Sequence, residues 1–193
     1  MGISLSKGGN ISLSKAEPGL TKILVGLSWK PRTTHGQAFD LDASALCLYE
    51  DGRAKSDSDF IYFDNDKSPN GAIVFGGDNR TGTGEGHDET LTIDLSQIPA
   101  DVTRVQFIIN IHEGKERGQC FGQVGDAKVE VLNQETSNSI ALYELNEDAS
   151  VETVVVMGEV YRHGEDWKFR AIGQGYEQGL IGVLANVGLV ATA

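Results

Sequence analysis

Short runs rich in Val, Ile, Phe and Tyr recur along almost the whole chain, and each is bounded by Gly, Asp, Asn or Pro. β-Branched and aromatic residues favour strands, whereas the bounding residues favour turns. The repeated strand-and-turn spacing therefore predicts an all-β fold, an antiparallel β-sandwich, rather than alternating β and α units. The pattern alone leaves a barrel open. The runs lie at 22–29, 43–50, 59–63, 72–76, 90–95, 102–112, 127–133, 139–145, 151–163 and 167–173.

The two ends of the chain carry different patterns. In residues 3–13, Ile and Leu alternate with Ser and Lys around Gly8, Gly9 and Asn10, which predicts a β-hairpin because Gly and Asn accept the positive φ of a tight turn. Only residues 176–187 resemble a helix of useful length, and we expect this C-terminal helix to dock on the core. The uncharged run that ends the chain is shorter than the ~18 to 20 residues of a membrane span.

Length and charge limit the classes of function. A chain of 193 residues is long enough for one well-buried core and short for two, so we expect a single domain over residues 1–193. A net charge of −12 repels nucleic acid and anionic membranes unless a cation intervenes. The first residues have no apolar segment typical of a secretory signal, which predicts a cytoplasmic location.

Acidic residues gather in three places: Asp40 and Asp42, the segment 57–66, and the glycine-rich segment 76–90. Carboxylates crowded into one loop repel one another unless a cation lies between them. Ca²⁺ suits such a loop, because it takes 6 to 8 oxygens from carboxylates, amides and backbone carbonyls in adaptable geometry. The glycines let the backbone turn its carbonyl groups inward.

In the glycine-rich segment, Asp78, Asn79, Asp88 and Glu89 supply side-chain oxygens. Asp40 and Asp42, two residues apart on a strand, project to the same face and could form a second wall of the site. The alternative is that these loops are simply hydrated surface.

Other sites fit the sequence less well. Zinc would require closely spaced His and Cys, whereas the four histidines are scattered, and magnesium needs fewer carboxylates and usually a phosphate partner. Segment 64–75 imitates the start of an EF-hand but has Pro69 in place of Gly and Phe75 in place of the bidentate Glu. There is no P-loop, G-x-S-x-G or H-E-x-x-H motif, and His112 beside Glu113 is more typical of a surface pair than of a catalytic one.

A set of ordered motifs resembles the TerD family of bacterial tellurium-resistance and stress proteins. The resemblance runs from Ile3 to about Tyr176. The motifs are "LSKGGNISLSK", "FDLDASA", "GDNRTG" followed by "GHDE", "IHEGKERGQCFGQV" and "GEVYRHGEDWKFRAIGQGY".

The resemblance implies a β-sandwich that binds calcium through acidic loops at one end. It also implies that the protein is produced by bacteria from an operon linked to tolerance of tellurite, phage, colicin and other stress. No catalytic reaction is established for the family. We therefore expect Ca²⁺ as the cofactor, other proteins of a stress-response complex as partners, and no enzyme activity. The predicted metal-ligating positions, taken from the residue chemistry and from the family's motifs, are Asp40, Asp42, Asn65, Asp78, Asn79, Gly82, Glu85, Asp88 and Glu89.

The chain departs from the family's pattern at His87, where members usually carry Asp. If that position ligates the ion through its side chain, the affinity should fall. If it points to solvent, the change only reduces the charge. Asp64 lies beside the Asn65 that resembles the family's Asn-Asn pair, and it could partly replace the lost oxygen.

Two alternative functions stay open at this stage. One is an enzyme that processes tellurite or another oxyanion through Cys47, Cys120 or the metal, although the acidic surface repels oxyanions and no activating cation adjoins either cysteine. The other is a calcium-dependent membrane-binding module, because an ion held by a loop can bridge to lipid phosphate.

Overall fold

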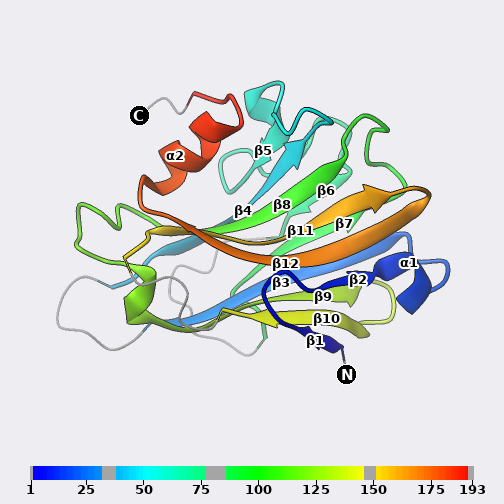
Figure 1. The fold of residues 1–193 in the computed structure, drawn as a ribbon, viewed down its shortest axis with the longest axis horizontal. Coiled ribbons are helices and arrows are strands. Elements are labelled where there is room, and N and C mark those ends of the chain that lie inside the picture. The colour runs from blue at the N-terminus through cyan, green and yellow to red at the C-terminus, as the bar shows by residue number, and fades with distance from the viewer. Residues whose placement is uncertain (1, 32–37, 77–85, 146–150, 191–193) are drawn as a thin grey trace.

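The computed structural model describes residues 2–31, 38–76, 86–145 and 151–190, which form two facing β-sheets (Figure 1). The prediction of an all-β sandwich is confirmed, and two separate sheets take the place of a closed barrel. The strands are β1 (Ile3–Leu5), β2 (Asn10–Ser12), β3 (Lys22–Pro31), β4 (Leu41–Leu48), β5 (Phe60–Ile61), β6 (Ile73–Phe75), β7 (Glu89–Asp94), β8 (Arg104–Ile111), β9 (Val124–Asn133), β10 (Ser139–Glu144), β11 (Val154–His163) and β12 (Asp166–Tyr176).

Sheet A has the strand order β1-β10-β9-β3-β7-β6, and sheet B has the order β2-β12-β11-β8-β4-β5. Neighbouring strands pair in the antiparallel sense, except that β1 runs parallel to β10. Short helical turns join some of them: α1 (Leu13–Ala16), η1 (Asp57–Asp59) and η2 (Phe121–Gln123).

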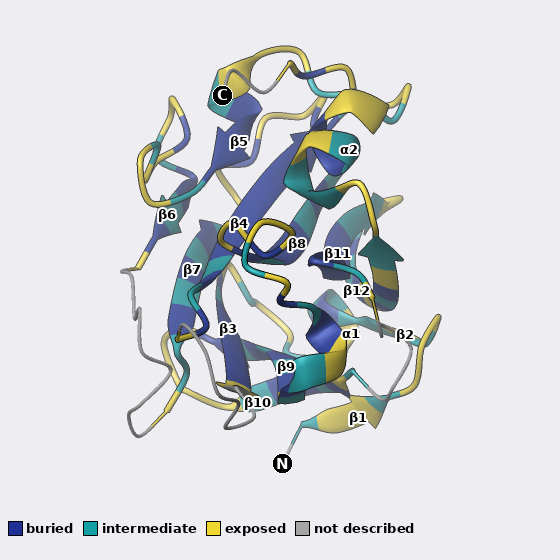
Figure 2. Ribbon diagram, turned by 90° about the vertical axis from the view of Figure 1, so that its left-hand side faces the viewer, coloured by how far each residue is buried: buried dark blue, intermediate teal, exposed yellow. Residues whose placement is uncertain are grey.

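The core lies between the sheets and follows from the two-residue period of a strand. Along β3, Ile23, Val25, Leu27 and Trp29 are almost fully buried, because alternate side chains of a strand point to one face. Buried surfaces of the two sheets accordingly face each other (Figure 2). Every strand-like run of the sequence contains or overlaps a strand of the structure.

The predicted N-terminal hairpin is wrong. Its two halves join different sheets: β1 extends sheet A beside β10, and β2 extends sheet B beside β12. The glycine turn does form, because the Gly9 N–H donates to the Ser6 carbonyl and Gly8 has a positive φ. The Gly8 N–H also donates to the Ala171 carbonyl of β12, and the Ala171 N–H donates to the Gly9 carbonyl. The turn therefore leads the chain from sheet A to sheet B instead of pairing β1 with β2. The chain gains an edge strand on each sheet, and Leu13, at the start of α1, becomes fully buried.

The predicted C-terminal helix is confirmed as α2 (Gly179–Asn186), which begins later than expected because β12 continues to Tyr176. α2 lies over β4 and β8 on the outer face of sheet B (Figure 2). There, Val183 and Leu184 pack with Leu46 and Ile108 in a second apolar cluster outside the main core. Within the described part of the chain, no helix has the length and apolar character to cross a membrane.

Candidate metal site and its surroundings

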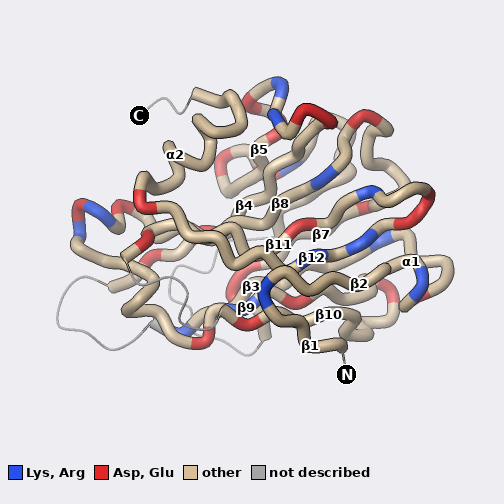
Figure 3. The backbone as a smooth tube through the Cα atoms, viewed as in Figure 1, with Lys and Arg blue, Asp and Glu red and all other residues tan. Residues whose placement is uncertain are grey.

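The predicted ligands divide into two groups. Asp78, Asn79, Gly82 and Glu85 lie outside the described residues, and their role as ligands stays a prediction. Asp40, Asp42, Asn65, Asp88 and Glu89 are described. Acidic positions recur along the loops and strand ends of the molecule (Figure 3), so only local geometry can distinguish a site from ordinary surface.

Residues 40–42 and 88–89 lie at the same end of the sandwich. β7 begins where β3 approaches its end, since Glu89 is paired with Leu27. β4 begins where β8 ends, since Leu41 is paired with Ile111. The sheets therefore bring two acidic segments that are far apart in the sequence to the same end of the molecule.

The Glu89 carboxylate joins the two sheets. Glu89 belongs to β7 of sheet A, is only 2% exposed, and accepts a hydrogen bond of 2.6 Å through Oε2 from the Ala43 N–H of sheet B. β5 pairs with β4 only at Ala45 and Leu46, so β5 does not extend as far as Ala43. The Ala43 N–H donates to the Glu89 side chain and not to a neighbouring strand. A buried N–H that lost this acceptor would cost free energy.

Asp88 and Asp40 are held by backbone contacts at the same end. Asp88 Oδ2 accepts from the Trp29 N–H at 2.8 Å, and the Asp88 N–H donates to the Leu27 carbonyl at 2.9 Å. The Asp40 carbonyl accepts from the His112 N–H at 2.7 Å. Asp40 Oδ1, however, is buried and has no hydrogen-bond partner among the described residues. A buried carboxylate oxygen normally has a partner, so this atom is a candidate ligand position.

Asp42 lies on the outer face of sheet B. Its Oδ2 accepts from Asn110 Nδ2 at 3.1 Å and lies 4.0 Å from His112 Nδ1. Asn110 has no predicted role from the sequence, and His112 is expected there only as a surface residue beside Glu113. One sequence feature could have identified both residues: Asn110 and His112 are polar, lie two positions apart in the mostly apolar run 105–112, and so project from the same face of a strand.

Asn65 lies in the loop after β5, where Nδ2 donates to the Phe60 carbonyl at 2.6 Å. It lines the same surface groove as Asp42. Across the described ranges, no three or more His, Cys, Asp or Glu side chains are arranged so that they could hold a metal ion. The described carboxylates therefore form only part of the predicted ligand set.

His87 follows neither of the two alternatives considered for it. Its ring lies over Gly26 of β3, where an added Cβ would be 2.2 Å from His87 Cγ. Nδ1 lies 3.2 Å from Ser28 Oγ, and Nε2 lies 3.5 Å from Glu130 Oε2. The side chain thus packs on the outer face of sheet A, half-buried, between β3 and β9.

The environment of His87 predicts a pH-dependent stability. Burial lowers the pKa of His87, and the nearby Glu130 carboxylate opposes this shift only in part. The unfolded chain therefore takes up a proton near pH 6.5 that the folded chain binds less well, so the contribution of His87 is complete above that pH and falls as the pH decreases. We expect urea unfolding in chelator to show a larger loss of stability between pH 7.5 and 5 for the native protein than for His87→Asn. Equal losses would contradict this assignment.

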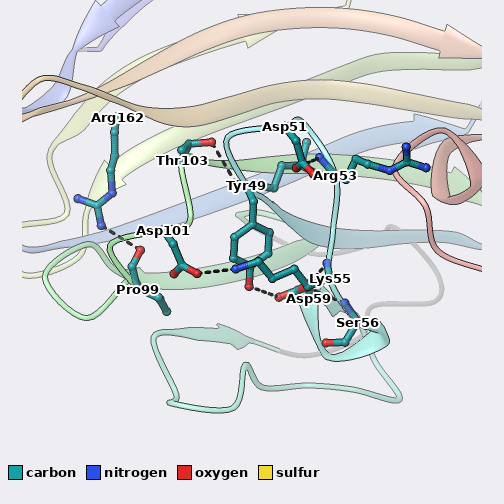
Figure 4. Close-up of polar contacts among 11 residues, drawn as sticks. Tyr49, Asp51, Arg53, Lys55, Ser56, Asp59, Pro99, Asp101, Thr103 and Arg162 are labelled. Atoms are coloured by element: carbon teal, nitrogen blue, oxygen red, sulfur yellow. Dashed lines mark hydrogen bonds and ion pairs between the residues drawn. The ribbon is translucent and has the colours of Figure 1, made fainter.

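The acidic segment 57–66 does not act as one cluster. Asp59 is buried, and it accepts from the Tyr49 hydroxyl at 3.0 Å and from the Lys55 and Ser56 N–H groups at 2.8 and 3.0 Å (Figure 4). These contacts tie the start of η1 to the end of β4, so Asp59 has a structural role. Asp57 is exposed and lines the groove that also holds Asn65.

Lys55 completes this polar network. Its ammonium lies 3.7 Å from the centre of the Tyr49 ring and 2.6 Å from Asp101 Oδ2 (Figure 4). Burial, followed by the hydrogen bond to Asp59, raises the pKa of Tyr49 to about 12. Tyr49 therefore stays protonated and donates to Asp59 at physiological pH.

Cys47 is a poor candidate for thiol chemistry. It is 6% exposed in β4, and burial, followed by the charge of Asp59, raises its pKa to about 12. The nucleophilic form of cysteine is the thiolate, which is scarce at neutral pH when the pKa is this high. Cys120 is partly exposed, and both cysteines are free thiols.

Comparison with known proteins assigns the chain to a family. Residues 1–186 match the TerD domain. The chain is 50% identical over 192 residues to "Tellurium resistance protein TerD" of Serratia marcescens, with 100% of both chains covered. It is 44% identical over 190 residues to "General stress protein 16U" of Bacillus subtilis, with 98% of both covered.

A solved structure supports the fold. A homologue of telluride resistance protein from Streptomyces coelicolor matches with a TM-score of 0.71 at 24% identity, covering 90% of this chain and 100% of that one. With the domain match and the full-length relatives, the conclusion is that the chain belongs to the TerD family of tellurium-resistance and stress-response proteins.

Proposed function

We propose that the protein is a calcium-binding member of this stress-response family that acts as a metal-dependent structural and interaction module and not as a catalyst. The observation that carries the proposal is Asp40 Oδ1, a buried carboxylate oxygen without a hydrogen-bond partner in the described part of the chain. It belongs to the segment just before β4, at the same end of the sandwich as Asp88 and Glu89. An uncompensated carboxylate in such a place favours a bound cation.

The donor chemistry fits a hard cation. Asp40, Asp42, Asp88 and Glu89 would hold the ion together with oxygens from the predicted positions of segment 78–85. A bound Ca²⁺ would supply positive charge that offsets carboxylate repulsion. The chain's own contribution is orientation: backbone N–H groups of Ala43 and Trp29 fix Glu89 and Asp88 before any ion arrives.

Interaction, and not catalysis, is the role that this arrangement favours. An ordered loop surface at one end of the sandwich would recruit other proteins of a cytoplasmic stress response only when the ion is bound. The buried thiol of Cys47, with its raised pKa, weighs against a thiol-based reaction on tellurite at that residue. Co-sedimentation with anionic liposomes, with and without calcium, separates protein recruitment from membrane binding.

Thermal unfolding tests the proposal. Calcium at about 100 times its dissociation constant stabilises the folded state by roughly 2.7 kcal/mol, or roughly 5 to 11 °C for a domain of this size. Asp40→Asn should reduce this calcium-dependent shift strongly, because it removes the charge and preserves the shape. Asp51→Asn, an exposed acid that accepts from the Arg53 N–H outside the predicted site, is the matched control and should retain the full shift. Identical melting of the native protein in calcium and in chelator would refute calcium binding.

A further inference from the structure

A groove of about 560 Å³ opens on the outer face of sheet B, beside α2 and the segment around β5. It lies outside the core, and none of the contacts described above fills it. Grooves of about 300–1,000 Å³ commonly bind small organic molecules. The lining residues are Asp42, Asp57, Ser58, Phe60, Tyr62, Phe63, Asn65, Asn110, His112, Leu180, Leu184, Leu189 and Val190.

One wall of the groove is aromatic. The Phe60 and Tyr62 rings stack with centroids 4.9 Å apart, and Phe63 meets Tyr62 edge-on at 5.3 Å. Leu184, from α2, also lines the groove. Phe63 remains 41% exposed and Val190 81% exposed at the lining. Large apolar side chains left exposed around one groove are typical of a binding surface.

The polar part of the groove is acidic. Asp42 lines it, oriented by the hydrogen bond from Asn110, and the exposed Asp57 contributes a second carboxylate. No Lys or Arg occurs among the described residues of the lining. With a net charge of −12, the molecule also raises the local concentration of cations and repels anions.

We infer that this groove binds a small organic cation with an apolar body, an alkyl- or arylammonium compound. Aromatic faces attract an ammonium group through the ring quadrupole, and the carboxylates add direct charge complementarity. The apolar body packs against the leucine side chains of α2 and the segment that follows it. The inference goes beyond calcium binding and does not require it. Because Asp42 and Asn65 are both predicted metal ligands and groove-lining residues, the test is run in chelator.

Benzyltrimethylammonium and 3-phenylpropionate are probes of similar size and opposite charge, and isothermal titration of the whole protein measures both. The cation should bind with saturation and at least about ten times more tightly than the anion. Absence of saturable cation binding, or equal binding of the anion, would overturn the inference. Because calcium is absent from this experiment, its failure would leave calcium binding standing, and a failed calcium test would leave the groove standing.

Surface variants locate the binding. Phe63→Ala and Asp57→Asn should each weaken benzyltrimethylammonium about fivefold, because one removes an aromatic face and the other a carboxylate. Ile181→Ala and Asp64→Asn are matched controls, since both side chains are exposed and neither lines the groove. Unchanged melting temperatures would exclude misfolding as the cause. Equal weakening by the controls would place binding elsewhere on the surface and contradict the inference.

Discussion

Replacement of Glu89 by alanine is expected to lower the free energy of unfolding by about 3 to 4 kcal/mol, which corresponds to a loss of roughly 10 °C in melting temperature. The substitution removes the acceptor of the Ala43 N–H, a buried contact of 2.6 Å between the two sheets. It also leaves a space at a position that is only 2% exposed. Urea unfolding in chelator measures the loss without any contribution from a metal.

Glu89→Gln is the informative control, because it keeps an oxygen that can accept from Ala43 and removes only the charge. In chelator, this variant should stay within about 1 kcal/mol of the native protein. In calcium, it should lose most of the metal-dependent stabilisation if Glu89 is a ligand. A Gln variant as unstable in chelator as the Ala variant would show that the charge, and not the hydrogen bond, supports the contact.

Gly26→Val should produce the second large effect, a loss of about 3 kcal/mol in the free energy of unfolding, because it overpacks the site. Valine itself favours strands, so its propensity would predict a gain on β3. The Cβ would instead stand 2.2 Å from Cγ of His87, whose ring occupies the space above the glycine. The ring must leave, and the contact with Ser28 is lost with it. Thermal and urea unfolding of the purified variant measure the loss.

A double-mutant cycle tests the cause of that loss. In the background of His87→Ala, Gly26→Val should cost less than in the native protein, with a coupling energy of about 1 kcal/mol or more. Additive losses would show that the valine collides with something other than the ring. Because His87 immediately precedes Asp88 and Glu89, the single variant should also weaken the calcium response, whereas the double variant should recover part of it.

Strand positions were predictable from the sequence because they depend on local features. The run at 22–29 alternates inward and outward side chains, and β3 occupies it almost unchanged. The acidic, glycine-rich character of segment 76–90 is equally local, and the calcium site that it indicates stays a prediction.

The pairing of the N-terminal segments could not be predicted in the same way. Residues 3–13 carry a hairpin pattern, but β1 and β2 find partners in β10 and β12, more than a hundred residues away. β1 and β2 add to the free edges of the two sheets, and those edges exist only when the other strands have paired. The groove on sheet B likewise depends on α2 meeting the segment around β5.

The fold class, the strand positions and the wealth of oxygen donors in the loops could thus be inferred from the amino-acid sequence, since propensity and alternation act between near neighbours in the chain. The role of each acidic residue became visible only in the folded molecule. Asp59 caps η1, Glu89 joins the sheets, and Asp40 keeps a buried oxygen without a partner among the described residues. Contacts between residues that are distant in the sequence set the burial and the hydrogen-bond partners of each side chain. The residue type and its near neighbours in the chain do not specify those contacts.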